Sequence, residues 1–329
     1  MKVTVLGAGA WGTALAIQIS RQHPVALWTR NQSHLSAMRE VRANHQYLGD
    51  FVFNDNLLPE GDLGAALKDT ELILSVVPTA GFRPMLQAIK ELDCKMPVIW
   101  ASKGLESGTA ELPHEVALEE LGDGHLWGAL SGPSFAAELV RDLPTAATIA
   151  SPDEAFARKA GAMLHGGNFR VYTSTDVIGV SVGGAIKNVM AIAAGISDGM
   201  QFGSNARAAL ITRGLAEMTR FGMALGGKRE TFMGLTGVGD LVLTCTGDYS
   251  RNREVGLRLA RGQTLDEILH SLGHVAEGVH TAREVLKRAA QLGVEMPITH
   301  EVDQVLYHGR APRVAVENLL KREQKSEVV

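Results

Sequence analysis

The chain has 329 residues, of which 45% are hydrophobic and 21% are charged, and its formal net charge is −4. This is the composition of a globular protein long enough for two domains with their own cores, and it excludes the strongly basic surface that nucleic-acid binding requires. A short basic run, KREQK, lies within the C-terminal segment 321–329, which we expect to be a solvated end.

Two cysteines, Cys94 and Cys245, lie far apart in the sequence and form no CxxC pair. We therefore expect neither a disulfide framework nor a zinc site, and a reducing cytoplasm is the predicted compartment. No apolar N-terminal segment precedes a cleavage site, and no run of about 18 uncharged apolar residues occurs, so neither a signal peptide nor a membrane span is predicted. The histidines are scattered without an HExxH pair, and no metal site is expected.

The first residues predict a nucleotide-binding turn. A β-branched run at 2–6 is followed by GAGAWG and then by a helical pattern. In this GxGxxG arrangement Gly7 permits the tight turn, Gly9 lets a pyrophosphate approach the backbone, and Gly12 lets the helix pack close to the strand. The phosphates would lie on the helix N-terminus, where free N–H groups favour anions. A purely structural turn is the alternative.

The next predicted strand, at 25–29, leads into Arg30. An NAD-selective site usually has an acidic residue at this point to bind the ribose hydroxyl groups. A cation suits a 2′-phosphate instead, so NADP is at least accepted. The alternative is an exposed arginine on a loop.

Alternating strands and helices continue to about residue 175, with further strands or extended pieces predicted at 51–57, 71–77, 97–101, 126–130, 145–150 and 169–172. Beyond that point every predicted element is a helix, at 177–200, 206–225, 253–261, 264–272, 281–292, 297–307 and 311–320. We therefore expect an α/β dinucleotide-binding domain at 1–175, with a Rossmann-type, doubly wound, mostly parallel sheet, and an all-α substrate domain at 176–329.

Polar groups follow the ends of two predicted strands. Lys103 comes after the strand at 97–101, and the turn from Gly132 to Ser134 comes after the strand at 126–130. Because ligands bind at the carboxyl ends of such strands, both are expected to face the cofactor. Lys103 would bind a phosphate or remain a surface lysine. The turn would offer N–H groups to an anion or would only connect a strand to a helix.

The segment 180–200 is apolar or small almost throughout and contains one cation, Lys187. A lysine in such a helix is either paired with an anion or poised to lose a proton. Gly183 and Gly184 precede it, and each lowers helix stability by about 1 kcal/mol relative to alanine. Such a cost suggests that the nicotinamide or the other domain packs closely against this backbone.

A second polar group is predicted farther along the chain. Residues 234–240 are interpreted as a glycine-rich loop that ends in Asp240. Ser250, Arg251 and Asn252 then supply a bidentate cation flanked by neutral hydrogen-bonding groups, which suits an oxyanion or a phosphate. The alternative is a helix capped by Ser250 or Asn252, with an exposed arginine.

Six segments closely resemble those of bacterial NAD(P)-dependent glycerol-3-phosphate dehydrogenases. They occur in the family's order and spacing over nearly the whole chain. They are GAGAWGTALA at the N-terminus, SKGLE at 102–106, SGPSFAAE at 131–138, GGAIKNVMAIAAGISDGM at 183–200, GLTGVGDLVLTCT at 234–246 and SRNREVG at 250–256.

The resemblance implies reversible hydride transfer between NAD(P)H and dihydroxyacetone phosphate, giving sn-glycerol 3-phosphate for phospholipid synthesis. It implies that Lys187 is the general acid/base, and Asp240 would orient its ammonium. Implied substrate-binding residues are Lys103, Gly132, Ser134, Lys187, Asp240, Ser250, Arg251 and Asn252. With the glycines of the turn, the cofactor-binding residues are Gly7, Gly9, Ala10, Trp11, Gly12, Arg30, Lys103, Ala136, Arg251, Val275 and Glu277.

Two other functions are weighed against this one. A related 3-hydroxyacid or 6-phosphogluconate-type dehydrogenase would also place a lysine on the first long helix of an α domain. A non-catalytic nucleotide sensor would have no need of that lysine. We expect a small-molecule substrate and NADP or NAD, with NADPH favoured. A homodimer is one possible assembly.

Overall fold

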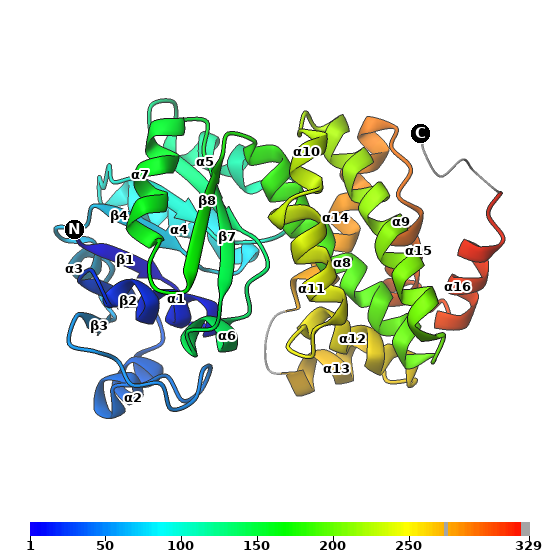
Figure 1. Ribbon diagram of the computed structural model, residues 1–329, viewed down its shortest axis with the longest axis horizontal. Helices are drawn as coiled ribbons and strands as arrows, with labels where there is room; N and C mark the ends of the chain where they lie inside the picture. The colour runs from blue at the N-terminus through cyan, green and yellow to red at the C-terminus, as the bar shows by residue number, and fades with distance from the viewer. Residues whose placement is uncertain (273–275, 324–329) are drawn as a thin grey trace.

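The computed structural model describes residues 1–272 and 276–323. A domain built on one sheet lies beside a domain built of helices (Figure 1). The first half of the chain forms the sheet domain and the second half forms the helical domain. This arrangement confirms the predicted combination of an α/β domain with an all-α domain.

Eight strands form a single sheet in the order β3-β2-β1-β4-β5-β6-β7-β8, and the one antiparallel pair among them is β6 with β7. The order changes direction between β1 and β4, which makes their carboxyl ends the switch point where such sheets bind ligands. The strands are β1 (Val3–Leu6), β2 (Val25–Trp28), β3 (Leu57–Glu60), β4 (Leu72–Ser75), β5 (Val98–Trp100), β6 (Trp127–Ser131), β7 (Thr145–Ala150) and β8 (Phe169–Ser174).

Helices cover both faces of this sheet, and each face has its own apolar core. Leu15 and Phe156 belong to one core, and Leu86 and Val116 belong to the other. A sheet buried on both faces explains why its central strands read as continuous apolar runs. The helices are α1 (Ala10–Ser20), α2 (Gln32–Val41), α3 (Leu63–Leu67), α4 (Phe82–Glu91), α5 (Pro113–Leu121), α6 (Ala136–Val140) and α7 (Glu154–Leu164).

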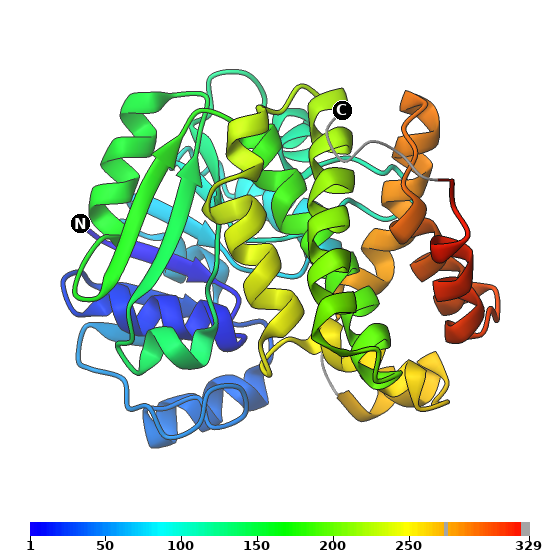
Figure 2. The same ribbon diagram turned by 45° about the vertical axis from the view of Figure 1, so that its right-hand side comes forward.

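The helical domain is built around α8 (Val177–Gly199), which contacts most of the helices that follow it. The last helix of this domain, α16 (Pro312–Leu320), lies at the outer edge, away from the sheet (Figure 2). The other helices are α9 (Gly203–Ala224), α10 (Arg229–Phe232), α11 (Asp240–Thr246), α12 (Arg251–Ala260), α13 (Leu265–Leu272), α14 (Glu277–Leu292) and α15 (Pro297–Tyr307).

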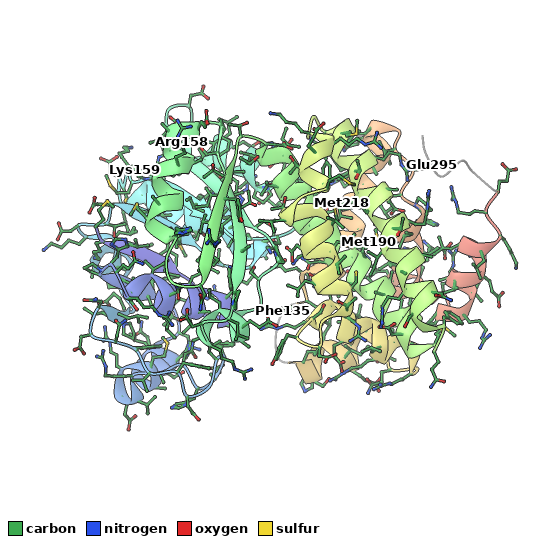
Figure 3. The ribbon with its side chains drawn as sticks, in the orientation of Figure 1. Phe135, Arg158, Lys159, Met190, Met218 and Glu295 are labelled. Atoms are coloured by element: carbon green, nitrogen blue, oxygen red, sulfur yellow. The ribbon has the colours of Figure 1, made fainter. Side chains whose placement is uncertain are left out.

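A helix that is apolar on all sides must be buried on all sides. Among the described residues α8 is the one helix long and apolar enough to cross a membrane, but 89% of its apolar window is buried inside the protein. Met190 of α8 and Met218 of α9 point into this core (Figure 3). We therefore interpret α8 as the core helix of its domain.

Two predictions about local structure are wrong. The edge strand is Leu57–Glu60 rather than 51–57, where the structure has an isolated bridge at Val52. Pro59 is tolerated there because β3 pairs with β2 on one side and has no neighbour on the other. The predicted loop at 234–240 is instead a wide helical turn, η2 (Leu235–Gly239), which continues into α11.

Candidate active site

The glycine turn has the geometry that its sequence predicts. Gly7 has a φ of +115°, and a Cβ added to Gly12 would lie 1.9 Å from the carbonyl oxygen of Gly7. Gly9 is the N-cap of α1, where neither a capping side chain nor an acidic residue in the first turn is present. A Cβ added to Gly9 would meet no atom of the described residues within 4 Å. The turn therefore leaves free N–H groups and open space for a phosphate.

Asn44, which is not among the predicted site residues, forms hydrogen bonds to the nucleotide turn. The amide nitrogen of Asn44 donates to the carbonyl oxygen of Ala8 at 2.9 Å and to Oγ1 of Thr13 at 2.7 Å. The amide oxygen of Asn44 lies 2.9 Å from Nε2 of His34. Because all three contacts are buried, Asn44 ties the loop after α2 to the nucleotide turn.

At the junction of the domains, one carboxylate binds two lysines. Asp240, the first residue of α11, accepts a hydrogen bond from Nζ of Lys187 with Oδ1 and one from Nζ of Lys103 with Oδ2 at 2.9 Å. Nζ of Lys103 also lies 3.4 Å from the carbonyl oxygen of Gly132. Residues from both domains thus meet at Asp240, as the sequence predicted for Lys103, Gly132 and Lys187.

Burial and charge shift the protonation equilibria in this cluster. Burial lowers the pKa of Lys187 to about 7; the carboxylate of Asp240 opposes this shift and the ammonium of Lys103 adds to it. Burial would raise the pKa of Asp240, but the two lysines outweigh burial and hold it below its ordinary value. The cluster therefore keeps an ionised carboxylate beside a lysine that can lose its proton near neutral pH.

The two glycines before Lys187 are sites of close approach. A Cβ added to Gly183 would lie 2.3 Å from the carbonyl oxygen of Thr236, in the turn that leads to Asp240. A Cβ added to Gly184 would lie 2.9 Å from Oγ of Ser131, at the end of β6 in the sheet domain. The sheet domain therefore packs against this backbone at Gly184. This is one of the two explanations proposed for the glycines, the other being the nicotinamide.

A chain of amide groups extends from this cluster to two further helices. The amide nitrogen of Asn188 lies 3.3 Å from the carbonyl oxygen of Lys103. The amide nitrogen of Asn252 donates to Oδ1 of Asn188 at 2.9 Å, and the amide oxygen of Asn252 accepts from the N–H of Gly278 at 3.0 Å. Asn188 is not among the predicted site residues; the signal for it is its place directly after Lys187 in an apolar helix, because buried polar groups need partners.

The first turn of α12 shows the capped helix that was one of the two alternatives, and the phosphate site stays a prediction. Ser250 is the N-cap, since its Oγ accepts from the N–H of Arg253 at 3.2 Å. Among the described residues the O–H of Ser250 donates to no acceptor, and Asn252 keeps one N–H beyond its bond to Asn188. Much of the Arg251 side chain is in contact with solvent. The protein atoms around its guanidinium still remove part of its hydration, which lowers its pKa, and Tyr47 of the sheet domain opposes this shift.

An aromatic contact joins the domains near this turn. The rings of Phe135 and Tyr249 lie 5.6 Å apart, and a Cβ added to Gly247 would lie 2.5 Å from the Phe135 ring. Figure 3 labels Phe135 at the boundary between the two domains. This contact brings the segment after Ser134 to the start of α12, although Ser134 itself makes a local bond to the carbonyl oxygen of Gly132 at 3.0 Å.

Four of the remaining predicted cofactor residues lie in the sheet domain. Ala10 and Trp11 begin α1, Arg30 is exposed two residues after the end of β2, and Ala136 begins α6. Val275 lies outside the described residues.

Glu277 begins α14, and its Oε1 accepts from the N–H of Thr79 at 3.1 Å. Burial raises the pKa of Glu277. Because Thr79 follows β4 at the switch point, this contact brings the start of α14 to the predicted nucleotide site.

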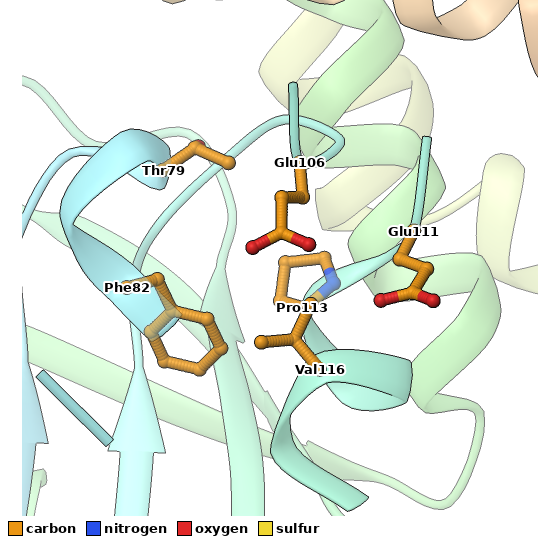
Figure 4. Close-up of a pocket in the computed structure, with 6 residues that line it drawn as sticks. All are labelled: Thr79, Phe82, Glu106, Glu111, Pro113 and Val116. Carbon is orange, nitrogen blue, oxygen red and sulfur yellow. The ribbon is translucent and has the colours of Figure 1, made fainter. Parts of the chain in front are cut away.

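A neighbouring hollow is part of the packing rather than a binding site. It has no room for a water molecule and is lined by Thr79, Phe82, Glu106, Glu111, Pro113 and Val116 (Figure 4). Beside it, Arg83 donates to Glu106 and Glu111 and also pairs with Glu119 and Glu120. This ion-pair network fixes the loop that follows Lys103.

A sheet domain with a nucleotide turn packs against a helical domain that holds a buried lysine at the junction of the two domains. This arrangement is typical of two-domain, nicotinamide-dependent dehydrogenases, and the chain has the architecture of that class.

Comparison with known proteins identifies the family. Residues 2–157 match the model of the NAD-dependent glycerol-3-phosphate dehydrogenase N-terminus, and residues 176–317 match that of its C-terminus. The glycerol-3-phosphate dehydrogenase [NAD(P)+] of Methylobacillus flagellatus is 76% identical over the full length of both chains. The chain belongs to the NAD-dependent glycerol-3-phosphate dehydrogenase family.

Solved structures agree with this assignment. The crystal structure of glycerol-3-phosphate dehydrogenase from Coxiella burnetii is 43% identical, has a TM-score of 0.93, and covers 98% of this chain and 99% of its own. A ketopantoate reductase from Ralstonia eutropha aligns with a TM-score of 0.59 at 16% identity over 97% of this chain and 100% of its own, which shows the fold alone. The wider fold is thus shared with enzymes that act on other substrates.

Proposed function

We propose that this chain catalyses the reversible reduction of dihydroxyacetone phosphate to sn-glycerol 3-phosphate with NADPH or NADH. The observation that carries the proposal is the bridge from Lys187 through Asp240 to Lys103. It joins the helical domain to the loop that follows β5 in the sheet domain. Membership of the glycerol-3-phosphate dehydrogenase family supports the same reaction.

The residues at the switch point suit a dinucleotide. The pyrophosphate would lie over Gly9, on the N–H groups of Ala10 and Trp11, because the start of α1 is uncapped and the space above Gly9 is open. Gly7 and Gly12 shape that turn. When bound, the nicotinamide cofactor supplies or accepts the hydride.

Arg30, Ala136, Arg251, Val275 and Glu277 would make the remaining cofactor contacts, as the family resemblance implies. Arg30 favours NADPH because its exposed guanidinium follows β2, where a 2′-phosphate would lie. The preference for NADPH over NADH therefore depends on the charge of Arg30 alone.

Lys187 would stabilise the oxygen of the ketone and donate its proton. Reduction of a ketone builds negative charge on that oxygen, and an ammonium group within hydrogen-bonding distance lowers the energy of this charge. Asp240 orients the ammonium through Oδ1, and its carboxylate opposes burial, which lowers the pKa of Lys187 to about 7. In the reverse direction neutral Lys187 would accept the proton from the alcohol.

Lys103 would act beside Lys187, because both ammonium groups contact the same carboxylate. Gly132 and Ser134 would place backbone and hydroxyl groups near the substrate, since the carbonyl oxygen of Gly132 lies 3.4 Å from Nζ of Lys103. These residues belong to the sheet domain, so the substrate would be held between the domains.

The phosphate of the substrate would lie at the first turn of α12. Arg251 would supply the cation, and Ser250 and Asn252 would donate the O–H and N–H that their other contacts leave free. Binding energy at this remote phosphate would hold the carbonyl group in line with the nicotinamide.

The proposal extends to the cellular setting. The product would feed phospholipid synthesis, as the family resemblance implies. A cytoplasmic location is supported by the two unpaired cysteines, Cys94 and Cys245, which suit a reducing compartment.

We also propose a homodimer. A groove of about 700 Å³ between α9, α15 and α16 is lined by apolar residues such as Leu210 and Leu319, with arginines and glutamates of both signs around it. Helices α9, α15 and α16 lie in the part of the helical domain that faces away from the sheet (Figure 1). Light scattering should give twice the chain mass for the protein and the chain mass for Leu210→Glu; a monomeric wild-type protein contradicts the dimer.

The test of the activity is an initial-rate assay of coenzyme oxidation with dihydroxyacetone phosphate and each coenzyme. Rapid oxidation with this substrate and none with 3-oxo acids supports the proposal. Turnover of 3-oxo acids in preference would assign the chain to the hydroxyacid dehydrogenases instead. Tight NADPH binding without turnover of any ketone would indicate a nucleotide sensor.

A further inference from the structure

Helices α8 and α12 touch through their backbones. A Cβ added to Gly195 would lie 2.0 Å from the carbonyl oxygen of Arg253, and one added to Gly256 would lie 2.0 Å from the carbonyl oxygen of Ile192. Real Cβ atoms do not approach oxygen so closely, so both positions require glycine. These contacts fix the separation of the helices, and Gly256 together with the bond from Asn252 to Asn188 places one side of α12 against α8.

A buried ion pair also restricts the rotation of α12 about its axis. Nε and Nη2 of Arg253 donate to Oδ2 of Asp198 at 2.9 and 2.7 Å. The two side chains are only 15% and 10% exposed. Two hydrogen bonds from one planar guanidinium to a carboxylate restrict orientation as well as distance, so they fix which side of α12 faces α8.

Asp198 lies in the last turn of α8, where the helix dipole disfavours a negative charge. A second arginine offsets this cost, because Nη1 of Arg207 on α9 lies 3.1 Å from both carboxylate oxygens of Asp198. Asp198 therefore joins α8, α9 and α12 at one point, and its charge is fully paired.

The rotation of α12 decides where Arg251 points. Successive residues of an α-helix are separated by about 100°, so residues two apart project to roughly opposite sides. Because Arg253 faces α8, Arg251 faces away from it, toward the sheet domain. The influence of Tyr47, a residue of the sheet domain, on the guanidinium of Arg251 agrees with this direction.

We propose that Arg253 and Asp198 are positioning residues that aim Arg251 at the substrate phosphate. This inference rests on the proposed role of Arg251 in phosphate binding. It adds a specificity element outside the reacting groups, since neither Arg253 nor Asp198 contacts Lys187 or Asp240 within the described residues. The ion pair would therefore matter for phosphorylated substrates and little for the carbonyl chemistry.

The test compares two substrates that differ by the phosphate. For Arg253→Met, kcat/KM with dihydroxyacetone phosphate should fall about 10- to 100-fold, the usual effect of a small misplacement of a binding group. With dihydroxyacetone, which lacks the phosphate, kcat/KM should change little. Arg253→Lys should recover part of the loss. The control Arg258→Met removes an arginine from the same helix that pairs with Glu254 rather than with α8, and it should leave both values unchanged.

Coupling provides the second readout. If Arg253 acts through Arg251, then Arg253→Met should have little further effect in an Arg251→Ala background. Additive losses, or equal losses with both substrates, would overturn the positioning role and indicate a general structural role. If Arg251→Ala does not change the ratio of kcat/KM for the two substrates, then the proposed phosphate site itself is wrong.

Two further measurements keep the result decisive. If Arg253→Met does not fold by circular dichroism, Asp198→Asn should show the same selective loss, because it keeps the shape of the side chain and removes its charge. If dihydroxyacetone is turned over too slowly, calorimetry replaces it: the Kd of sn-glycerol 3-phosphate should rise more than the Kd of NADPH, which keeps its contacts with the nucleotide turn. An equal rise in both constants contradicts the inference.

Discussion

Lys187 donates a hydrogen bond to Oδ1 of Asp240 across 53 positions of the sequence, and their side chains are 10% and 1% exposed. A buried pair of this kind is strongly destabilised when one partner is removed, typically by about 3–5 kcal/mol, because the other charge is left uncompensated. Here Lys103 is a second partner for Asp240. Replacement of Lys187 therefore leaves the carboxylate paired, which makes its chemical role testable in a folded protein.

Lys187→Met should lower kcat for dihydroxyacetone phosphate reduction by about 10²- to 10⁴-fold, the usual contribution of a general acid. The Kd of NADPH, measured by fluorescence titration, should remain within a few-fold of the original value because Lys187 does not lie at the nucleotide turn. The matched control is Lys159→Met, which removes an exposed lysine from α7 (Figure 3). A near-normal kcat for Lys187→Met contradicts the assignment.

The pH dependence should have opposite signs in the two directions. Below its pKa, lowered by burial to about 7, Lys187 is an ammonium and can donate a proton, so kcat/KM for ketone reduction should fall as the pH rises through this value. For alcohol oxidation, kcat/KM should rise over the same range. Asp240→Asn removes the carboxylate that raises the pKa of Lys187, so the midpoint should move to lower pH. A shift to higher pH would exclude Lys187 as the titrating group.

Arg30→Asp should reverse the coenzyme preference. An aspartate at the end of β2 repels a 2′-phosphate and accepts hydrogen bonds from a 2′-hydroxyl, so kcat/KM should fall for NADPH and hold or rise for NADH. Removal of one charge-assisted contact corresponds to a loss of about 10- to 100-fold with NADPH. Arg39→Asp, on α2 nearby, is the control. Parallel changes with both coenzymes would place the 2′-phosphate away from Arg30.

Arg251→Ala should raise the KM for dihydroxyacetone phosphate by about 10- to 100-fold, as expected for the loss of hydrogen bonds to a charged group. The KM for the coenzyme should change less, because the coenzyme keeps its contacts with the nucleotide turn. Arg261→Ala, at the other end of α12, serves as the control. An unchanged KM for the substrate would mean that the phosphate binds elsewhere.

Gly256→Ala should lower the free energy of unfolding by about 1–3 kcal/mol, because the added methyl group has no space and overpacking forces the helices apart. The alanine Cβ would lie 2.0 Å from the carbonyl oxygen of Ile192. Gly64→Ala is the control: its Cβ meets no atom closer than 3.4 Å, and alanine favours a helix. Urea denaturation measures both. Equal stability of the two variants would contradict the close contact of α8 with α12.

Much of the fold and some of the site could be predicted because the signals are local. Gly7 and Gly12 are required by backbone geometry within one turn. The apolar runs of the parallel strands follow from burial on both faces of the sheet. The wrong predictions concern elements with weak local signals: β3 is an edge strand that contains Pro59, and the turn before Asp240 is helical despite its glycines.

Local patterns in the amino-acid sequence predicted that a nucleotide turn opens the chain and that a long apolar helix carries a lysine either paired with an anion or poised to lose a proton. Only the tertiary structure decided that Lys103 shares that anion, and that Asn188 connects Lys103 to Asn252. The reason is that the two kinds of interaction act over different distances along the chain. Backbone geometry and burial act over a few residues, whereas a hydrogen bond between distant segments exists only after packing has brought the two domains together.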